Sequence, residues 1–192
     1  MTPQRRDKIL ATTCYIRRGI AEEEETLFLL RDADLNDFLY GTYVGLGGKI
    51  KNGERPENTS IREVFEESGG ETSEGKKGLQ VKKQSYKGLL LFDNQGRSFA
   101  NGKLQPDWYV HAFMAREFSG EIGLSKEGTL VWIHRSRLDD IAMHEADRVF
   151  ISWLDREGIF SARFCYEDKT LTSYEATFYL PTGEIEEKTW ER

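Results

Sequence analysis

The segment from residue 48 to residue 70, GKIKNGERPENTSIREVFEESGG, constrains the fold of this chain more than any other. It contains three glutamates at positions i, i+3 and i+4, namely Glu63, Glu66 and Glu67. At about 100° per residue, these side chains lie on one face of a helix. Like charges so close destabilise an isolated helix, and a divalent cation such as Mg²⁺, which accepts carboxylate oxygens, removes the repulsion. The pattern therefore predicts a helix that binds a metal ion.

Local signals fix the two ends of this helix. Pro56 suits the first turn, where the missing N–H of proline costs nothing, and Glu57 lies at the positive end of the helix dipole. Gly69 and Gly70 suit the other end, because glycine adopts the left-handed conformation that stops a helix. We therefore expect one helix between Pro56 and Gly69.

An ion pair and a glycine-rich turn accompany the helix. Arg62 precedes the first of the three glutamates and can reach back to Glu54, which would tie the preceding loop to the helix through a bidentate pair. Glycines at 45, 47 and 48 permit close approach of the backbone to a ligand. We expect Gly47 and Gly48 to contact a substrate.

The rest of the chain alternates between strand and helix patterns. Alternating or β-branched segments predict strands at 8–17, 26–33, 79–94, 107–117, 128–135, 160–166 and 174–180, and residues 38–45 lead into the glycine-rich turn. Apolar residues at helical spacing predict a second helix at 147–157. Polar stretches at 71–77 and 95–106 predict loops. The order favours a mixed α/β (α+β) fold with a sheet against helices, in which residues 1–157 form the main domain and residues 158–192 a C-terminal hairpin extension.

Composition excludes several classes of protein. The chain has 192 residues, a net charge of −6 and no block of Lys or Arg, so we expect no binding of extended nucleic acid. No stretch approaches ~18 consecutive apolar residues, so we expect no membrane span and a soluble, cytoplasmic protein. Cys14 and Cys165 both lie in expected strands, where two buried thiols are expected and a single disulfide is the alternative.

The segment 48–70 resembles the Nudix box. That pattern is a glycine, five residues, a glutamate, seven residues, Arg-Glu, an aliphatic residue, any residue, Glu-Glu, any residue, a glycine and an aliphatic residue. The matching positions are Gly48, Glu54, Arg62, Glu63, Val64, Glu66, Glu67 and Gly69. Gly70 departs from the pattern, since the family usually has an aliphatic residue there, but it removes no ligand. The resemblance implies the Nudix fold, a mixed β-sheet between helices.

The resemblance also implies a chemistry. Nudix enzymes hydrolyse a nucleoside diphosphate linked to another group, and Mg²⁺ (or Mn²⁺) neutralises charge on the phosphates and lowers the pKa of the attacking water. The resemblance assigns metal binding to Glu63, Glu66 and Glu67. It assigns an orienting role to Arg62 and Glu54. The base is one of these glutamates or an acid from a later loop. For that acid we favour Glu127, with Glu121 as the alternative and a purely solubilising role as the third.

The second half of the chain is similar to the MutT-like branch that contains 8-oxo-dGTP diphosphatases. In that branch an aromatic residue stacks on the purine and acids read its edge. Here His144 takes the stacking position and Asp147 remains as one acid, while Val44 stands where an asparagine is common. The structural alternatives are that His144 fills space or caps a helix, and that Asp147 is the N-cap of the second helix.

Three aromatic residues, Tyr43, Phe92 and Trp108, either line the base pocket or pack in the core. The expected function is Mg²⁺-dependent hydrolysis of a nucleoside triphosphate, with an oxidised purine dNTP such as 8-oxo-dGTP as a candidate substrate, to the monophosphate and pyrophosphate. Two alternatives stay open: a Nudix hydrolase of ADP-ribose, a dinucleoside polyphosphate or an RNA 5′ end, and a non-catalytic nucleotide-binding module. The expected partner is a small nucleotide, and the chain is a monomer or a homodimer.

Overall fold

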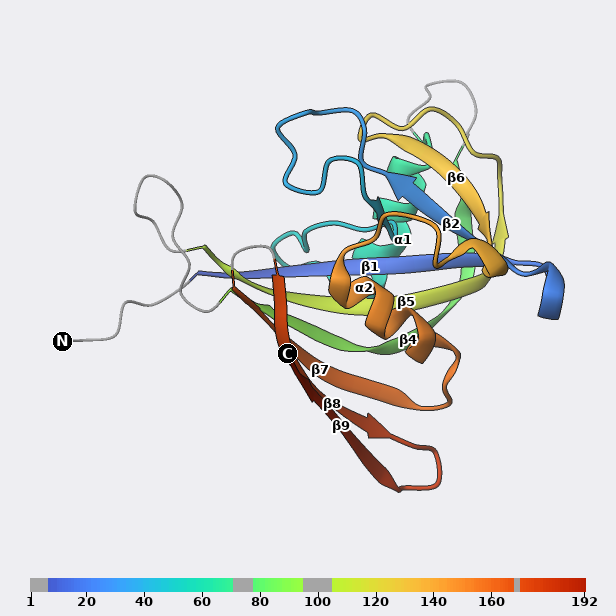
Figure 1. Ribbon diagram of the computed structural model, residues 1–192. Helices are drawn as coiled ribbons and strands as arrows, with labels where there is room; N and C mark the ends of the chain where they lie inside the picture. Colours follow the sequence, from blue (N-terminus) through green and yellow to red (C-terminus); the bar gives the residue numbers. More distant parts are fainter. Residues whose placement is uncertain (1–6, 71–77, 95–104, 168–169) are drawn as a thin grey trace.

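A computed structural model describes residues 7–70, 78–94, 105–167 and 170–192 (Figure 1). The expected loop at 71–77 and most of the expected connection at 95–106 lie outside these residues. Among the described residues, no helix is long and apolar enough to cross a membrane.

In the described residues, the elements follow the order that the sequence predicts, with three short 3₁₀ helices (η), a two-residue strand and a final strand added. They are β1 (Lys8–Arg18), η1 (Ala21–Glu23), β2 (Glu25–Leu30), β3 (Tyr43–Val44), α1 (Pro56–Glu67), β4 (Gln80–Asp93), β5 (Asp107–Ser119), β6 (Thr129–His134), η2 (Arg135–Arg137), α2 (Glu145–Phe150), η3 (Ile151–Asp155), β7 (Ile159–Glu167), β8 (Thr170–Tyr179) and β9 (Ile185–Glu191).

All the strands join one mixed sheet in the order β3-β2-β1-β5-β4-β7-β8-β9, and β6 pairs with β2. The pairs β1–β5 and β4–β7 are parallel, whereas the other pairs are antiparallel. The C-terminal strands therefore continue the sheet from β4, as Figure 1 shows. The expected mixed fold is confirmed.

The two faces of the sheet carry separate apolar clusters. Neighbouring residues of β1 point to opposite sides, so Cys14 belongs to one cluster and Tyr15 to the other. The smaller cluster includes Val64 of α1, and the larger one includes Phe150 of α2 and Trp153 of η3. The sheet therefore lies between α1 and the α2–η3 segment, which places the acidic helix and the segment around residue 144 on different faces.

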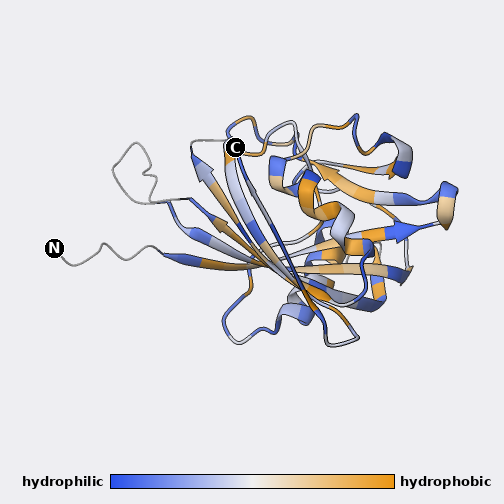
Figure 2. Cartoon of the chain, turned by 60° about the horizontal axis from the view of Figure 1, so that its bottom comes forward, coloured by the Kyte–Doolittle hydropathy of each residue, from blue (hydrophilic) through white to orange (hydrophobic). Residues whose placement is uncertain are grey.

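Three elements differ from the sequence expectation. Strand β3 is a two-residue strand inside the segment that leads into the glycine-rich turn. The second helix begins at Glu145 rather than at residue 147, and it tightens into η3 after Phe150, although Trp153 and Leu154 stay buried as the helical spacing requires. Strand β9 was not expected. Every residue of β9 is exposed, so it lacks the apolar alternation that reveals a strand, and in Figure 2 this C-terminal segment is largely hydrophilic.

Both cysteines are free and buried, as expected. Burial raises the pKa of the Cys14 thiol to about 12, so this thiol is unreactive at neutral pH.

Candidate active site

Helix α1 is anchored so that its acidic residues keep their positions. Val64 is fully buried against the sheet. The Ser68 hydroxyl donates to the carbonyl of Val64 (2.5 Å) and accepts from the N–H of Leu79 (2.6 Å), which ties the end of the helix to the segment before β4. Gly69 follows with a φ of 98°, a left-handed conformation that favours glycine. The helix therefore ends where the glycine pattern predicts.

Arg62 connects the helix to the loop before it. Its Nε donates to Oε1 of Glu54 (2.8 Å) and its Nη2 to Oε2 of Glu54 (2.9 Å), so the predicted bidentate pair is present. Its Nη1 donates to Glu63 (2.6 Å) and to Glu66 (3.0 Å). The bond with Arg62 lowers the pKa of the Glu54 carboxyl to about 2. Arg62 thus keeps these carboxylates together on one side of α1.

Glu67 has a different environment from Glu63 and Glu66. It is buried, and its Oε2 accepts a hydrogen bond from the N–H of Gly47 (2.8 Å). Burial raises the pKa of the Glu67 carboxyl, and the negative charges of Glu127 and Glu63 raise it further. A buried carboxylate among other carboxylates is electrostatically unfavourable unless a cation lies beside it.

Gly48 has no room for a side chain. A Cβ added there would lie 2.6 Å from the carboxyl carbon of Glu63. The backbone of the glycine-rich loop, residues 45–48, therefore passes directly against the acidic face of α1. This contact explains why the box requires a glycine at this position.

The negative charge of Glu127 raises the pKa of the Glu67 carboxyl. Glu127 forms an ion pair with Arg31, which follows β2 and also binds Asp37 (2.6 Å). Glu121 lies elsewhere: its carbonyl accepts from the N–H of Gly78 beyond the end of α1. The sequence analysis did not identify Arg31, because only the fold brings it to Glu127.

The carboxylates of α1 have the chemistry of a divalent-cation site. Mg²⁺ prefers hard oxygen ligands, and α1 presents three carboxylates on one face. One of them, Glu67, is buried and has a raised pKa. The described residues hold no group of three or more His, Cys, Asp or Glu side chains already gathered as metal ligands. Arg62 engages Glu63 and Glu66 here, while the N–H of Gly47 engages Glu67.

The second group of predicted residues lies at the start of α2. His144 is the N-cap residue, and its Nδ1 lies 2.8 Å from the hydroxyl of Tyr166 on β7. The two rings are 4.7 Å apart, and Phe38 approaches the His144 ring at 6.4 Å. Burial lowers the pKa of His144, so the imidazole is neutral at neutral pH. Sequence reasoning missed Tyr166, which lies 22 residues further along the chain.

Asp147 is buried in the larger cluster, in the first turn of α2. The alternative that Asp147 is the N-cap is wrong, because His144 takes that position. Burial raises the pKa of the Asp147 carboxyl from 3.8 to about 7. Its charge also raises the pKa of Tyr15 and Tyr166. A buried carboxyl that changes its protonation near neutral pH is a common feature of functional sites.

The other predicted residues fall around these two groups. Val44 is half-buried on β3, where it pairs with Leu29. Tyr43 packs edge-on against Phe28 and donates its N–H to the carbonyl of Ala142, just before the His144 segment. Phe92 stacks on Phe164 in the larger cluster, which supports the packing alternative for this residue.

Trp108 lies at the edge of the glycine-rich loop. The ammonium of Lys49, the residue after Gly48, lies 5.6 Å from the Trp108 ring. Sequence reasoning did not single out Lys49, although its position beside the box glycine was a usable signal. A cation there adds positive charge next to an otherwise acidic region.

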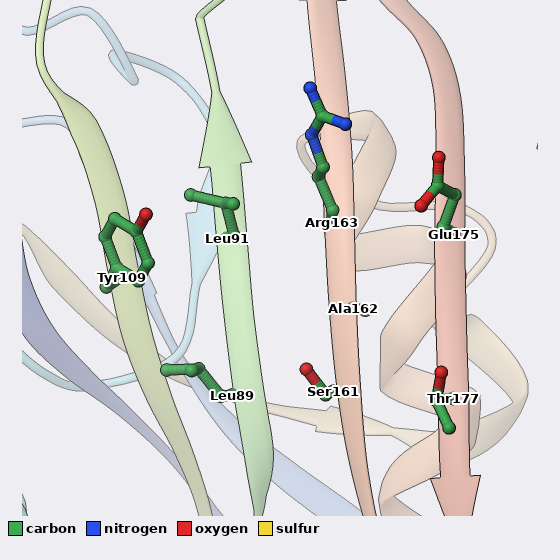
Figure 3. Close-up of a pocket in the computed structure, with 8 residues that line it drawn as sticks. All are labelled: Leu89, Leu91, Tyr109, Ser161, Ala162, Arg163, Glu175 and Thr177. Atoms are coloured by element: carbon green, nitrogen blue, oxygen red, sulfur yellow. The ribbon is translucent and has the colours of Figure 1, made fainter. Parts of the chain in front are cut away.

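A shallow depression of about 250 Å³ lies elsewhere on the sheet (Figure 3). Residues of β4, β5, β7 and β8 line it: Leu89, Leu91, Tyr109, Ser161, Ala162, Arg163, Glu175 and Thr177. None of them belongs to α1, to the glycine-rich loop or to α2. The depression is therefore separate from the candidate active site.

Comparison with known proteins agrees with this geometry. The model of the NUDIX domain family matches residues 10–154, which is most of the chain. Among solved structures, a mutator MutT protein from Bacillus halodurans is 23% identical, with 94% of this chain and 97% of that chain covered and a TM-score of 0.62. A MutT protein from Methanosarcina mazei Go1 is 19% identical over 80% and 96% of the two chains, with a TM-score of 0.57.

The NUDIX domain of NrtR from Shewanella oneidensis, solved with ADP ribose, is 13% identical over 77% of this chain and 86% of that chain, with a TM-score of 0.50. These structural likenesses concern the fold, whereas the family match covers the box itself. The chain belongs to the NUDIX family and is a Nudix hydrolase.

Proposed function

We propose that this Nudix hydrolase cleaves a purine nucleoside triphosphate to the monophosphate and pyrophosphate, with an oxidised purine such as 8-oxo-dGTP as a candidate substrate. The main support for this proposal is the position of the glycine-rich loop, residues 45–48. The loop contacts both the glutamate group of α1 and the residues packed around α2. Gly47 donates its N–H to Glu67 of α1, and Gly45 lies against the ring of Tyr15, which packs in the larger cluster with Ala146 and Phe150 of α2. Two residues of extended chain span at most about 7 Å, so these two contacts lie close together along the loop.

At the acidic end, Glu63, Glu66 and Glu67 would hold Mg²⁺ or Mn²⁺. The ion would neutralise phosphate charge and lower the pKa of a bound water. Arg62 orients this set, because it bonds Glu54 with two nitrogens while its third holds Glu63 and Glu66. Gly47 and Gly48 bring backbone next to the glutamates, where a diphosphate would lie.

Glu127 is the proposed proton acceptor for the attacking water. Its charge acts on the Glu67 carboxyl, and an ion pair with Arg31 holds its carboxylate in place. Its side chain remains 47% exposed, so a water molecule can reach it. Glu127 would therefore take the proton that the water loses as its oxygen bonds to phosphorus.

At the other end, His144 and Asp147 form the proposed base site. Both come from one turn of chain, and Tyr43 and Val44 connect the β3 side of the site to the glycine-rich loop. A neutral imidazole held beside Tyr166 suits donation of a ring N–H to an acceptor on the base, and a buried carboxyl suits hydrogen bonding to the base edge. These features favour a purine over a sugar or a second phosphate chain as the group recognised.

The proposed organisation keeps residues 1–157 as the catalytic domain and 158–192 as an extension of it. The proposed setting is a cytoplasmic pool of small nucleotides, with the protein as a monomer or homodimer.

A substrate panel tests the proposal. Steady-state kcat/KM would be measured for dGTP, 8-oxo-dGTP, dCTP, ADP-ribose and a dinucleoside tetraphosphate, with Mg²⁺, with Mn²⁺ and with EDTA. The proposal predicts the highest values for the purine triphosphates and no turnover in EDTA. A preference for ADP-ribose, which the NrtR domain binds, or for the tetraphosphate would replace the proposed substrate class. No turnover of any compound would favour a binding module.

A further inference from the structure

Three residues of the C-terminal segment hold the His144 segment through four contacts. Tyr166 of β7 accepts a hydrogen bond from the N–H of Ala146 (3.0 Å) and bonds His144. Glu145 accepts from the N–H of Leu171 on β8 (3.1 Å) and pairs with Arg192 after β9 (3.2 Å). The residues that make these contacts, Tyr166, Leu171 and Arg192, all follow residue 154, where the match to the family model ends. The base site is therefore shaped by a part of the chain outside the matched domain.

The direction of the Tyr166–His144 hydrogen bond follows from proton counting. The N–H of Ala146 can only donate, so the Tyr166 oxygen accepts from it. Tyr166 is 3% exposed, and burial raises the pKa of its hydroxyl, so this hydroxyl keeps its proton. The nearest acceptor recorded for that proton is Nδ1 of His144 at 2.8 Å. A buried hydroxyl without an acceptor is unfavourable, so Tyr166 donates and Nδ1 accepts.

The state of the imidazole then follows. A neutral histidine whose Nδ1 accepts a hydrogen bond carries its single proton on Nε2. Burial disfavours the doubly protonated form. Within the described part of the chain, no protein group is recorded as a hydrogen-bond partner of Nε2. That N–H is therefore available to a ligand.

We propose that Tyr166 is a positioning residue for base recognition: its hydroxyl holds His144 as the Nε2–H tautomer, so that the site offers a fixed ring N–H donor to an acceptor atom on the base. The selectivity part of this inference rests on the proposed function. The tautomer part rests on the contacts alone. Purines carry ring-nitrogen and carbonyl acceptors on the edges that such a donor would meet.

The tautomer is measured by ¹⁵N–¹H long-range correlation NMR of protein labelled on its histidines. A spectrum of His144→Gln assigns the His144 signals by their disappearance. Wild-type protein should show Nδ1 without a proton and Nε2 with one. A protonated Nδ1 in the wild type would overturn the proposal without recourse to any variant.

Tyr166→Phe removes the hydroxyl and keeps the ring. The variant should populate both tautomers of His144, and it should bind the α,β-methylene analogue of dGTP about 5-fold more weakly while its affinity for the dCTP analogue stays unchanged. Tyr174→Phe is the matched control, because Tyr174 is buried in the same cluster against Trp153. An unchanged His144 spectrum in Tyr166→Phe, or the same changes in Tyr174→Phe, would refute the role of Tyr166.

The two claims fail separately. If neither analogue binds while the wild-type spectrum shows the Nε2–H tautomer, the proposed function fails and the control of His144 by Tyr166 stands. If the analogues bind with equal losses for purine and pyrimidine in Tyr166→Phe, nucleotide binding stands and the selectivity role is refuted.

Discussion

The two ends of the candidate site are built in different ways. At the acidic end, the contacts among Glu54, Arg62, Glu63 and Glu66 all lie within one loop and one helix, and Gly47 adds a bond to Glu67 from the same segment. At the base end, the residues around His144 are held by β7, β8 and the end of the chain. The first end is local in sequence, and the second is assembled by the fold.

This difference has a functional consequence. Changes in the C-terminal strands can alter the base site without reaching the glutamates of α1, because the two groups lie on helices that pack against opposite faces of the sheet. Hydrolysis and selectivity should therefore respond to different substitutions. Substitutions at either end of the site test this separation.

The largest effect is expected for Glu67→Gln. It removes a charged oxygen ligand while keeping the shape and the acceptor for Gly47, so kcat should fall by at least ~10²-fold for every substrate. Thermal unfolding and circular dichroism should stay close to wild type. Glu57→Gln, on the exposed first turn of the same helix, is the control and should keep full activity. An unchanged kcat in Glu67→Gln would mean that the metal is held elsewhere.

Arg62→Lys should have the next largest effect. A lysine cannot bond both oxygens of Glu54 and also hold Glu63 and Glu66, so kcat/KM should fall about 10-fold for purine and pyrimidine triphosphates alike. Glu54→Gln weakens the same pair. Because the two residues act together, the double variant should lose little more than the worse single one. A fall confined to purines would contradict the separation of the two ends.

His144→Ala should change selectivity rather than rate. Loss of the ring removes the proposed contact with the base, so KM should rise about 10-fold for purine triphosphates while kcat and the KM for dCTP stay near wild type. Equal effects on dGTP and dCTP kinetics would remove His144 from the base site. A large fall in kcat would show that the base site and the glutamates of α1 do not act separately.

The smallest effect concerns stability and Asp147. Its pKa is about 7 in the folded chain against an ordinary 3.8, so between these pH values the folded state holds a proton that the unfolded chain has lost. The free energy of unfolding therefore falls as pH rises from about 4 to about 7. Asp147→Asn cannot ionise, so its stability relative to wild type should rise by about 1–3 kcal/mol between pH 5 and pH 8, as measured by urea denaturation. A constant difference would show that the carboxyl is not buried as described.

The same contrast explains how much of the molecule could be predicted from the sequence. The bounds of α1, the Arg62–Glu54 pair and the position of most strands follow from short-range patterns: Pro56 and Gly69 mark the helix, and alternating residues mark the strands. The mixed sheet follows from their order. These features depend on neighbours within one segment, which the sequence displays directly.

The rest depends on contacts between distant segments. Tyr166 reaches Ala146 only because β7 pairs in parallel with β4, and Arg31 reaches Glu127 only because β2 pairs with β6. Neither pairing has a local signal. Strand β9 was not predicted for a different reason. A fully exposed edge strand needs no apolar face, so its sequence shows no apolar alternation. Residues assembled across the sheet were therefore the ones that sequence reasoning missed.

The central claim is that the glutamates of α1 support cleavage of the nucleotide between its α- and β-phosphates. The most direct test is a ³¹P NMR time course of the protein with dGTP and Mg²⁺. The account predicts that the three triphosphate signals are replaced by monophosphate and pyrophosphate in equal amounts, with no change in EDTA. Release of orthophosphate with a nucleoside diphosphate, or no change with metal present, would contradict it.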